Sequence, residues 1–333
     1  MRGQRLPTDF ERYGLFEGDL APDNRALLLT IDFEAFSPDD LDRWLDAMRQ
    51  WTLLSTQGGW RFSIFLAIED VVRLRAAGGG VYDRFLGALR ELFEAGTRFY
   101  PHNHGVFDER TGLLAAGRRQ RVPGYAKRAS FAYDVVHRHG QNFSEWINRV
   151  VYHYDSFLSD AGIPRPQQLA FRAGGWDHGD TAESTRAFVR ALERNSFSLD
   201  SSASSGVFGT PSWRIGAPFG SNVFALSPSI IEVAPCWSLD LHVKLTTRYG
   251  LASLRRLLGQ PRLWRSREAP GAFVTVLHFD HLLRPTPSRD ARDDPVPRSL
   301  VQERTRRFFR LASIIRAASH LNSATFEELS IRR

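Results

Sequence analysis

Residues 27–36 read LLLTIDFEAF, an apolar run that ends in two acids, Asp32 and Glu34, with one phenylalanine between them. The run predicts a buried β-strand over 26–31. A buried carboxylate is costly unless a cation or a hydrogen-bond donor accompanies it. The two acids therefore either meet partners from other segments, or simply begin a loop that caps the next helix.

Similar apolar runs recur along the chain, with amphipathic segments between them. Further strands are expected at 62–68, 97–101, 168–172, 197–199, 230–234 and 273–278. Helices are expected at 39–54, 81–96, 143–162, 180–195 and 300–320. Apolar strands that alternate with amphipathic helices indicate an α/β fold with a mainly parallel sheet covered by helices. Seven or eight such units favour a barrel over an open doubly wound sheet, which stays an alternative.

The length of 333 residues fits one large domain or two ordinary ones. No repeat or low-complexity linker divides the chain, so we expect an N-terminal arm over 1–25 and a single domain over 26–333. Cys236 is the only cysteine, which excludes an internal disulfide and a cysteine-rich zinc site. Together with the lack of a signal-peptide pattern or a membrane-span pattern, it predicts a cytoplasmic protein.

The net charge of +7 comes from 44 Lys and Arg residues, nearly all of them Arg, against 37 acidic residues. Such an excess can favour nucleic acid or another anionic partner. The arginines are scattered rather than gathered into one tract, so we expect no nucleic-acid partner. If nucleic acid were bound through them, affinity would fall steeply with salt.

Ionisable residues follow the ends of four predicted strands. They are Asp32 and Glu34, His102 and His104, Arg172, and His278 with Asp280 and His281 behind it. In a parallel barrel these strand ends share the face on which active sites are built. Singly, each has an ordinary interpretation as a helix cap, an incidental surface residue, a surface ion pair or a structural histidine. Jointly, they form the set of side chains that a metal-dependent hydrolase uses.

The order of these motifs resembles the polysaccharide deacetylase (NodB-homology, carbohydrate esterase family 4-like) superfamily of metal-dependent amide hydrolases. The similar stretches, in order, are LTIDFE, AGTRFYPHNHG, AFRAGGW, SLDSSAS and VLHFDH, and the ending ATFEELS is also similar. The resemblance covers residues 26–330 and identifies the chain as a divergent member. It implies a distorted (β/α)7 barrel and one divalent metal ion, commonly zinc.

Carried over position by position, the resemblance makes Glu34 and His102 metal ligands. The family's usual second histidine lies four residues after the first, and that position here is Val106, so His104 is expected as the third ligand instead. Asp32 becomes the general base, Arg172 its orienting partner, and His278 the general acid.

The chemistry that follows is removal of an N-acyl group, acetyl or formyl, from an amino sugar or a glycan precursor, a small-molecule class of partner. Trp176 and Trp237 are candidates for the walls of a substrate site, or are ordinary core aromatics. Asp200 is a candidate for substrate contact or for a turn cap. Asp280 is a candidate for substrate contact, and Asp280 or another nearby acid is expected to orient the imidazole of His278.

Three other functions stay open at this point. A catalytically degenerate relative would bind glycan without hydrolysing it. A hydrolase of another C–N bond would act on a substrate such as a cyclic ureide. A metal-free glycoside hydrolase would use Asp32 and Glu34, about 6–7 Å apart by strand rise, as its carboxylate pair. That last function leaves the histidines unexplained, and chelator sensitivity separates it from the metal-dependent hydrolase.

Overall fold

The computed structural model describes residues 18–20, 22–23, 25–34, 41–78, 80–103, 143–173, 182–202, 222–235, 237–240, 243, 272–283 and 296–331.

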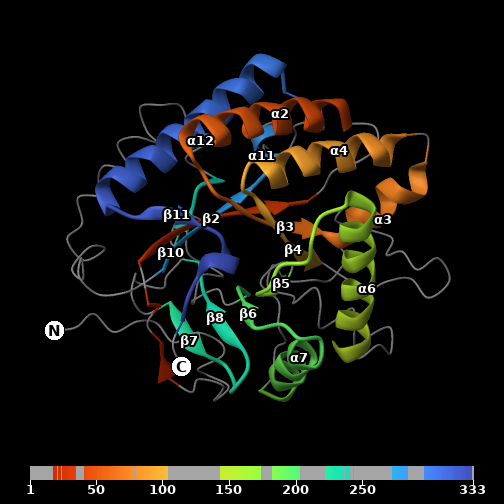
Figure 1. Cartoon of the computed structure of the whole chain (residues 1–333), viewed down its shortest axis with the longest axis vertical. Coiled ribbons are helices and arrows are strands. Elements are labelled where there is room, and N and C mark those ends of the chain that lie inside the picture. The colour runs from red at the N-terminus through yellow and green to blue at the C-terminus, as the bar shows by residue number, and fades with distance from the viewer. Residues whose placement is uncertain are drawn as a thin grey trace, which may run out of the picture.

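A curved sheet lies at the centre of the molecule and helices pack outside it (Figure 1). The strands are β1 Gly18–Asp19, β2 Ala26–Phe33, β3 Ser63–Ala67, β4 Arg98–Asn103, β5 Ala170–Ala173, β6 Leu199–Asp200, β7 Val223–Ala225, β8 Ile231–Val233, β9 Trp237–Ser238, β10 Ala272–His278 and β11 Asn322–Ala324. The path β9-β10-β2-β3-β4-β5-β6-β8 is parallel throughout.

The two ends of this parallel path are close together in the chain. β8 ends at Val233 and β9 begins at Trp237, and the connection between them can span at most about 14 Å. The sheet therefore curls round into a nearly closed barrel, and the α/β barrel expected from the sequence is confirmed. Among the described residues, β9 is one of the shortest strands, and it pairs with β10 at two positions, Thr275↔Trp237 and Val276↔Ser238.

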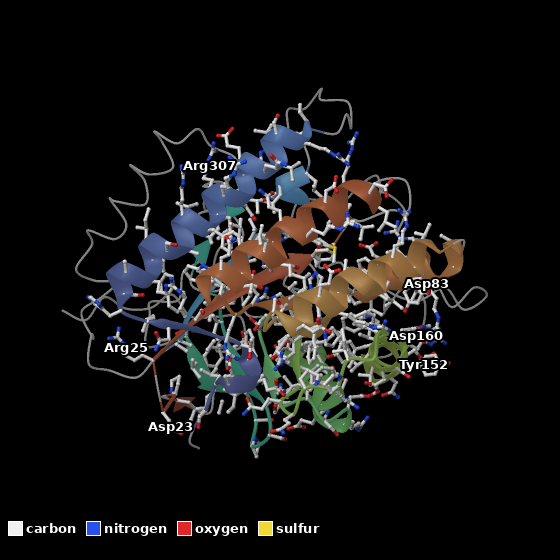
Figure 2. The ribbon with its side chains drawn as sticks, turned by 45° about the horizontal axis from the view of Figure 1, so that its top comes forward. Asp23, Arg25, Asp83, Tyr152, Asp160 and Arg307 are labelled. Atoms are coloured by element: carbon white, nitrogen blue, oxygen red, sulfur yellow. The ribbon has the colours of Figure 1, made fainter. Side chains whose placement is uncertain are left out.

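The helices form a layer outside the barrel. They are α2 Leu41–Gly58, α3 Ile68–Ala77, α4 Val81–Glu94, α6 Phe143–Ala161, α7 Ala182–Arg194, the short α11 Asp280–Leu283 and α12 Arg298–Ser319, followed by the 3₁₀ turn η3 Phe326–Glu328. α12, α2 and α4 lie side by side, and Tyr152 on α6 is among the exposed side chains at the edge (Figure 2). No helix in the described part of the chain is long and apolar enough to span a membrane.

The strands alternate between two apolar layers. On β2, Leu27 and Leu29 pack with the helices in the outer layer, whereas Leu28 belongs to an inner cluster made of residues from the strands and the chain's last turn. Successive side chains of a strand point to opposite faces. Asp32 and Glu34 therefore point the same way as Leu28, into the barrel.

The inner cluster is closed at the amino ends of the strands. β11 pairs with the first residues of β2, and η3 then places Phe326 against Phe65 and Tyr100 at ring-centroid distances of 5.5 and 5.7 Å. A capping box between Thr325 and Glu328 fixes this turn. The candidate residues lie at the other end of the barrel, the carboxyl end of its strands.

All seven strands expected from the sequence are present, and all five expected helices. The short strands β1, β7, β9 and β11 were not expected, because two or three residues carry no periodic pattern, and the helices α3 and α11 were not expected either. In the arm, β1 pairs antiparallel with β7, and Pro22 bridges to Ile331. The division into an arm and one domain stays a prediction.

Candidate active site at the carboxyl end of the barrel

Asp32 and Arg172 form a buried ion pair at the centre of the barrel mouth. Arg172 Nη1 donates to Asp32 Oδ1 at 2.5 Å, and the two side chains are 0% and 2% exposed. The guanidinium also lies over the ring of Phe65, 4.0 Å from its centroid. An ion pair that is buried this deeply needs further hydrogen bonds to offset its desolvation.

Ser201, directly after β6, supplies those bonds. Its Oγ accepts from Arg172 Nη2 at 2.9 Å and donates to the carbonyl of Val233 at 2.9 Å. Its carbonyl oxygen accepts from Arg172 Nε at 3.3 Å. Arg172 is thereby held on one side by the β6 end and on the other by Asp32, so the orientation of the Asp32 carboxylate is fixed.

Glu34 and His102 face each other across the barrel mouth. His102 Nδ1 lies 2.9 Å from the carbonyl oxygen of Arg172, which can only accept, so this nitrogen carries the proton. In the neutral ring Nε2 is therefore an acceptor, and it lies 3.4 Å from Glu34 Oε2, also an acceptor. Two acceptors face each other stably only when a proton or a cation lies between them.

The spacing of these two atoms suits a metal ion. Ligand atoms that are about 2.0–2.1 Å from a tetrahedral zinc lie roughly 3.4 Å from each other. A histidine ligand that donates its other N–H to a backbone carbonyl is the usual arrangement around zinc. The donor set of Glu34 and His102 therefore fits the divalent ion that the resemblance implies.

His278 lies on the strand next to Asp32, at the same register. Its Nε2 is 3.7 Å from Asp32 Oδ2 and 3.8 Å from Glu34 Oε1. Its Nδ1 donates to Asp240 Oδ2 at 2.7 Å, and its backbone N–H donates to Asp240 Oδ1 at 2.8 Å. The imidazole thus points Nε2 at the two acids of β2 and is held from behind by Asp240.

Electrostatics favour the charged forms of this pair. Burial opposes ionisation of Asp240, yet His278 and then His281 outweigh it and hold the pKa of Asp240 well below its usual range. Burial likewise opposes the charge on His278, but Asp240, Glu34 and Asp32 raise the pKa of His278 well above its ordinary value. A histidine held protonated beside two carboxylates can act as a proton donor.

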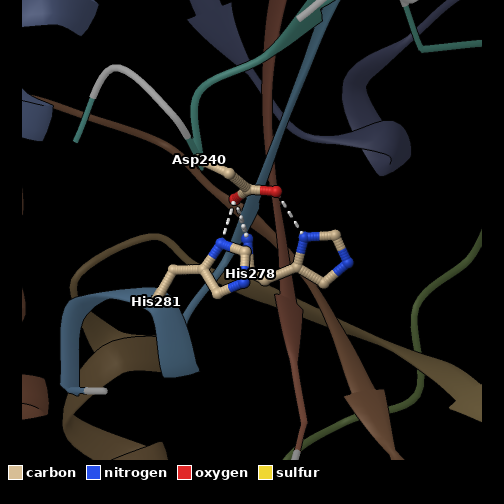
Figure 3. Close-up of side chains that lie close together, drawn as sticks. All are labelled: Asp240, His278 and His281. Atoms are coloured by element: carbon tan, nitrogen blue, oxygen red, sulfur yellow. Dashed lines mark hydrogen bonds and ion pairs between the residues drawn. The ribbon is translucent and has the colours of Figure 1, made fainter. Parts of the chain in front are cut away.

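Asp240 is the acid that orients His278, a role that the sequence left to Asp280 or another nearby acid. Asp240 follows β9, and the two residues of β9 are too few to predict a strand from the sequence. The stretch WSLD nevertheless has the same pattern as the end of β2, an apolar run that ends in an acid. Its second oxygen is 3.3 Å from His281 Nδ1 (Figure 3).

The end of β4, which carries His102, is anchored from outside the barrel. Trp146 Nε1 on α6 donates to Asn103 Oδ1 at 2.6 Å, and Asn103 Nδ2 donates to Glu69 Oε2 on α3 at 2.6 Å. All three side chains are buried. This network ties the strand end to two helices and so limits the movement of the neighbouring His102.

Asp200 lies elsewhere. It is fully buried, and it points to the outer face because its neighbour Leu199 belongs to the inner cluster. It accepts from Ser202 Oγ at 2.6 Å and pairs with Glu232 across the β6–β8 ladder. Burial raises the pKa of Asp200 to about 6, against smaller opposing hydrogen bonds from Glu232 and Ser202. Its substrate contact stays a prediction.

Four predicted site residues are not placed. His104 and Trp176 lie outside the described residues. Trp237 is on β9 and Asp280 begins α11, but their side chains are outside the described part of the structure. The structure therefore brings together Asp32, Glu34, His102, Arg172 and His278, and adds Asp240, Ser201 and His281 to them.

No protein-family model matches the chain, and no curated protein matches it. Solved structures with a similar fold include a protein described as a polysaccharide deacetylase from Mycobacterium smegmatis, with 14% identity, a TM-score of 0.45, and coverage of 93% of this chain and 98% of that one. A family 4 carbohydrate esterase from Streptomyces lividans has 11% identity, a TM-score of 0.40 and coverage of 94% and 98%. Puue allantoinase has 11% identity, a TM-score of 0.47 and coverage of 91% and 87%. At these values the likenesses carry no functional information by themselves.

Proposed function

We propose that this chain is a divergent polysaccharide deacetylase-like hydrolase that removes an acetyl or formyl group from the nitrogen of an amino sugar or glycan precursor. The observation that carries the proposal is the pair Glu34 Oε2 and His102 Nε2, two acceptors 3.4 Å apart. It supports a divalent cation, zinc by the family resemblance, directly beside an acid–base pair.

Glu34 and His102 would hold the ion, with His104 as the expected third ligand. Such an ion polarises an acyl carbonyl and lowers the pKa of a water molecule towards ~7. The remaining protein groups then have to accept one proton and deliver one, because amide hydrolysis converts an amide and water into a carboxylic acid and an amine.

Asp32 is the group that accepts the proton of the attacking water. Arg172 occupies Asp32 Oδ1, so Oδ2 is the oxygen turned toward His278 and the site. The water oxygen bonds to the acyl carbon while its proton passes to Oδ2. Because Arg172 and Ser201 fix the carboxylate, little reorganisation is needed at that moment.

His278 is the group that delivers a proton. Its Nε2 faces the same small volume as Asp32 Oδ2, and Asp240 on Nδ1 supports the imidazolium. As the carbon–nitrogen bond breaks, Nε2–H passes to the departing nitrogen, which leaves as the amine.

The competing functions explain less of this geometry. A glycoside hydrolase built on Asp32 and Glu34 has no use for His102, and its carboxylate Asp32 is committed to Arg172. A glycan-binding relative without activity requires no acid–base pair. A cyclic ureide is hydrolysed by the same groups, so it differs from our proposal only in substrate.

The first experiment measures metal content. The purified chain is loaded with one equivalent of zinc, desalted and analysed for elements, beside Glu34→Gln, His102→Ala and His104→Ala variants, with His153→Ala as a histidine control on α6. We expect about one tightly held zinc per chain, lost in the Glu34, His102 and His104 variants and retained in the control. Loss in the His102 variant but not in the His104 variant would show that His104 is not the third ligand. If both the Glu34 and the His102 variants keep their zinc, these two residues are not metal ligands and the proposed metal site is wrong.

The second experiment measures release of free amine from N-acetylated and N-formylated amino sugars and their short oligomers, with allantoin as the ureide. Activity that a chelator abolishes and zinc restores supports the hydrolase. Chelator-resistant glycosidic cleavage would instead support the carboxylate-pair alternative. Tight glycan binding without any turnover would support a degenerate relative.

A further inference from the structure

The imidazole of His278 lies between two different sets of donor atoms. Its Nε2 faces Asp32 and Glu34, whereas its Nδ1 faces Asp240. Beyond Asp240 lies His281, whose Nδ1 is 3.3 Å from the other carboxylate oxygen (Figure 3). The proposed hydrolase uses His281 in no proton transfer.

Asp240, His278 and His281 have the composition and spacing of a metal site. One carboxylate oxygen and two imidazole nitrogens all lie within 4.8 Å of one another. The two histidines are three residues apart, where β10 passes into α11, and their ring centroids are 5.3 Å apart. Two histidines and one carboxylate are a ligand set that zinc accepts, with a position left for water.

These three side chains are partly exposed. The side chains of His278 and His281 are 26% and 27% exposed, and that of Asp240 is 13% exposed. Glu34 and His102, in contrast, are 10% and 2% exposed, so the two donor sets differ in accessibility.

We propose that Asp240, His278 and His281 bind a second divalent ion, zinc, and that this ion inhibits the hydrolase. The metal-binding half stands on these three residues alone, and the inhibition rests on the proposed function. Because the first site uses Glu34 and His102, and the second uses the opposite edge of the His278 ring, both are occupied together at high zinc.

Inhibition follows from the proton balance at His278. A metal ion takes the place of the proton on His278 Nδ1, and that proton is released to solvent. The imidazole then carries only its Nε2 proton, and a neutral ring coordinated in this way is a much weaker acid than imidazolium. Protonation of the departing nitrogen becomes slow, although Asp32 and the first metal site are untouched.

The test titrates zinc into the metal-free full-length protein by calorimetry and follows amine release in parallel. The variants are His281→Gln for the second site and His102→Gln for the first, with His153→Gln as the matched histidine control. Because His281 also contacts Asp240, the activity of each variant at one zinc per chain serves as its own reference for the later additions of zinc.

We expect two binding phases in the wild type and in His153→Gln. The weaker phase should drop at least about 10-fold in affinity in His281→Gln, since even the outer partners of metal ligands are worth that much. Activity should fall as the weaker phase saturates in the wild type and stay constant in His281→Gln. The nitrogen NMR signals of His278 Nδ1 and His281 Nδ1 should shift together with that phase.

An unchanged weak phase in His281→Gln, or a weak phase without shifts of these two nitrogens, would overturn the second site. Loss of the weak phase with unchanged inhibition would overturn the regulatory half. If the chain has no hydrolase activity, the binding phases and the NMR shifts still test whether the second metal site exists. Failure of the proposed function can therefore be distinguished from failure of the second site.

Discussion

Asp32 and His278 occupy the same register on two adjacent parallel strands, and Asp32 Oδ2 lies 3.7 Å from His278 Nε2. The backbone reinforces this alignment, because the N–H of Phe279 donates to the carbonyl oxygen of Asp32 at 2.9 Å. The separation between the expected base and the expected acid is therefore fixed by the strand ladder rather than by flexible loops. Rigid placement of this kind is what general acid–base catalysis requires.

Replacing Arg172 by methionine should destabilise the chain by about 3–5 kcal/mol at pH 7, because Asp32 is left as an uncompensated buried charge. Denaturant unfolding measures the loss. Arg165→Met, which breaks an exposed pair with Asp155, should cost at most about 1 kcal/mol. The double variant Asp32→Asn/Arg172→Met should regain part of the loss, and a double variant no better than the single one would argue against this cause.

Replacing Asp240 by asparagine should lower kcat for amine release by roughly 10²-fold or more while KM changes little, because the imidazolium loses its carboxylate partner. Steady-state kinetics on the best N-acyl substrate measure both constants. Asp155→Asn serves as a control on an exposed acid. An unchanged kcat would show that Asp240 does not support the acid.

Replacing Asn103 by alanine should cost about 2–4 kcal/mol in stability, because Trp146 Nε1 and Glu69 lose a buried hydrogen-bond partner. It should also weaken zinc binding at the first site by about 10-fold, since the strand end that bears His102 is no longer anchored. Thermal unfolding and a zinc titration measure the two effects. Asn195→Ala, whose side chain donates to the Ala191 carbonyl at the end of α7, should leave zinc affinity unchanged.

Replacing Asp200 by asparagine should change how stability depends on pH. The pKa of Asp200 is raised from 3.8 to about 6 in the folded chain, so its contribution is fully present below pH 3.8 and is lost as pH rises through 6. The variant cannot ionise, so relative to the wild type it should gain up to about 3 kcal/mol between pH 4 and pH 7.

Unfolding free energies at pH 4, 5, 6 and 7 check this difference. The exposed Asp42→Asn should follow the wild type throughout. A difference between Asp200→Asn and the wild type that does not vary with pH would mean that the carboxyl does not ionise in this range, for example because Glu232 keeps the shared charge.

The sequence carries enough information for the barrel and for most of the site, and the reasons are physical. β2 and β10 are long apolar runs, and a chain that ends such runs in Asp32 and His278 must place those polar groups at the strand ends. Asp240 was missed because β9 is held by its place in the barrel and has no periodicity of its own. The pairing of Arg172 with Ser201 was missed for a similar reason, because it joins two strand ends that only the folded barrel brings together.

The outward direction of Asp200 is the other feature that sequence patterns do not settle. A strand of two residues is too short to show an alternation of apolar and polar side chains. The sequence therefore does not predict on which face the Asp200 carboxylate lies, and this depends on the burial of Leu199. His281 is a related case. The stretch LHFDH does not show whether this histidine only lies in the first turn of a helix or also contacts Asp240.

The small number of ladder positions between β9 and β10 affects how the protein loses activity on heating. Asp240 follows a strand with two ladder positions, and strands with so few backbone bonds open locally at lower free energy than the rest of a fold. Detachment of β9 would withdraw Asp240 from His278 while β2, β4 and β5 keep their places. Turnover should therefore disappear several degrees before the bulk of the barrel melts, and amide hydrogen exchange at Leu239 and His278 should be the first to quicken.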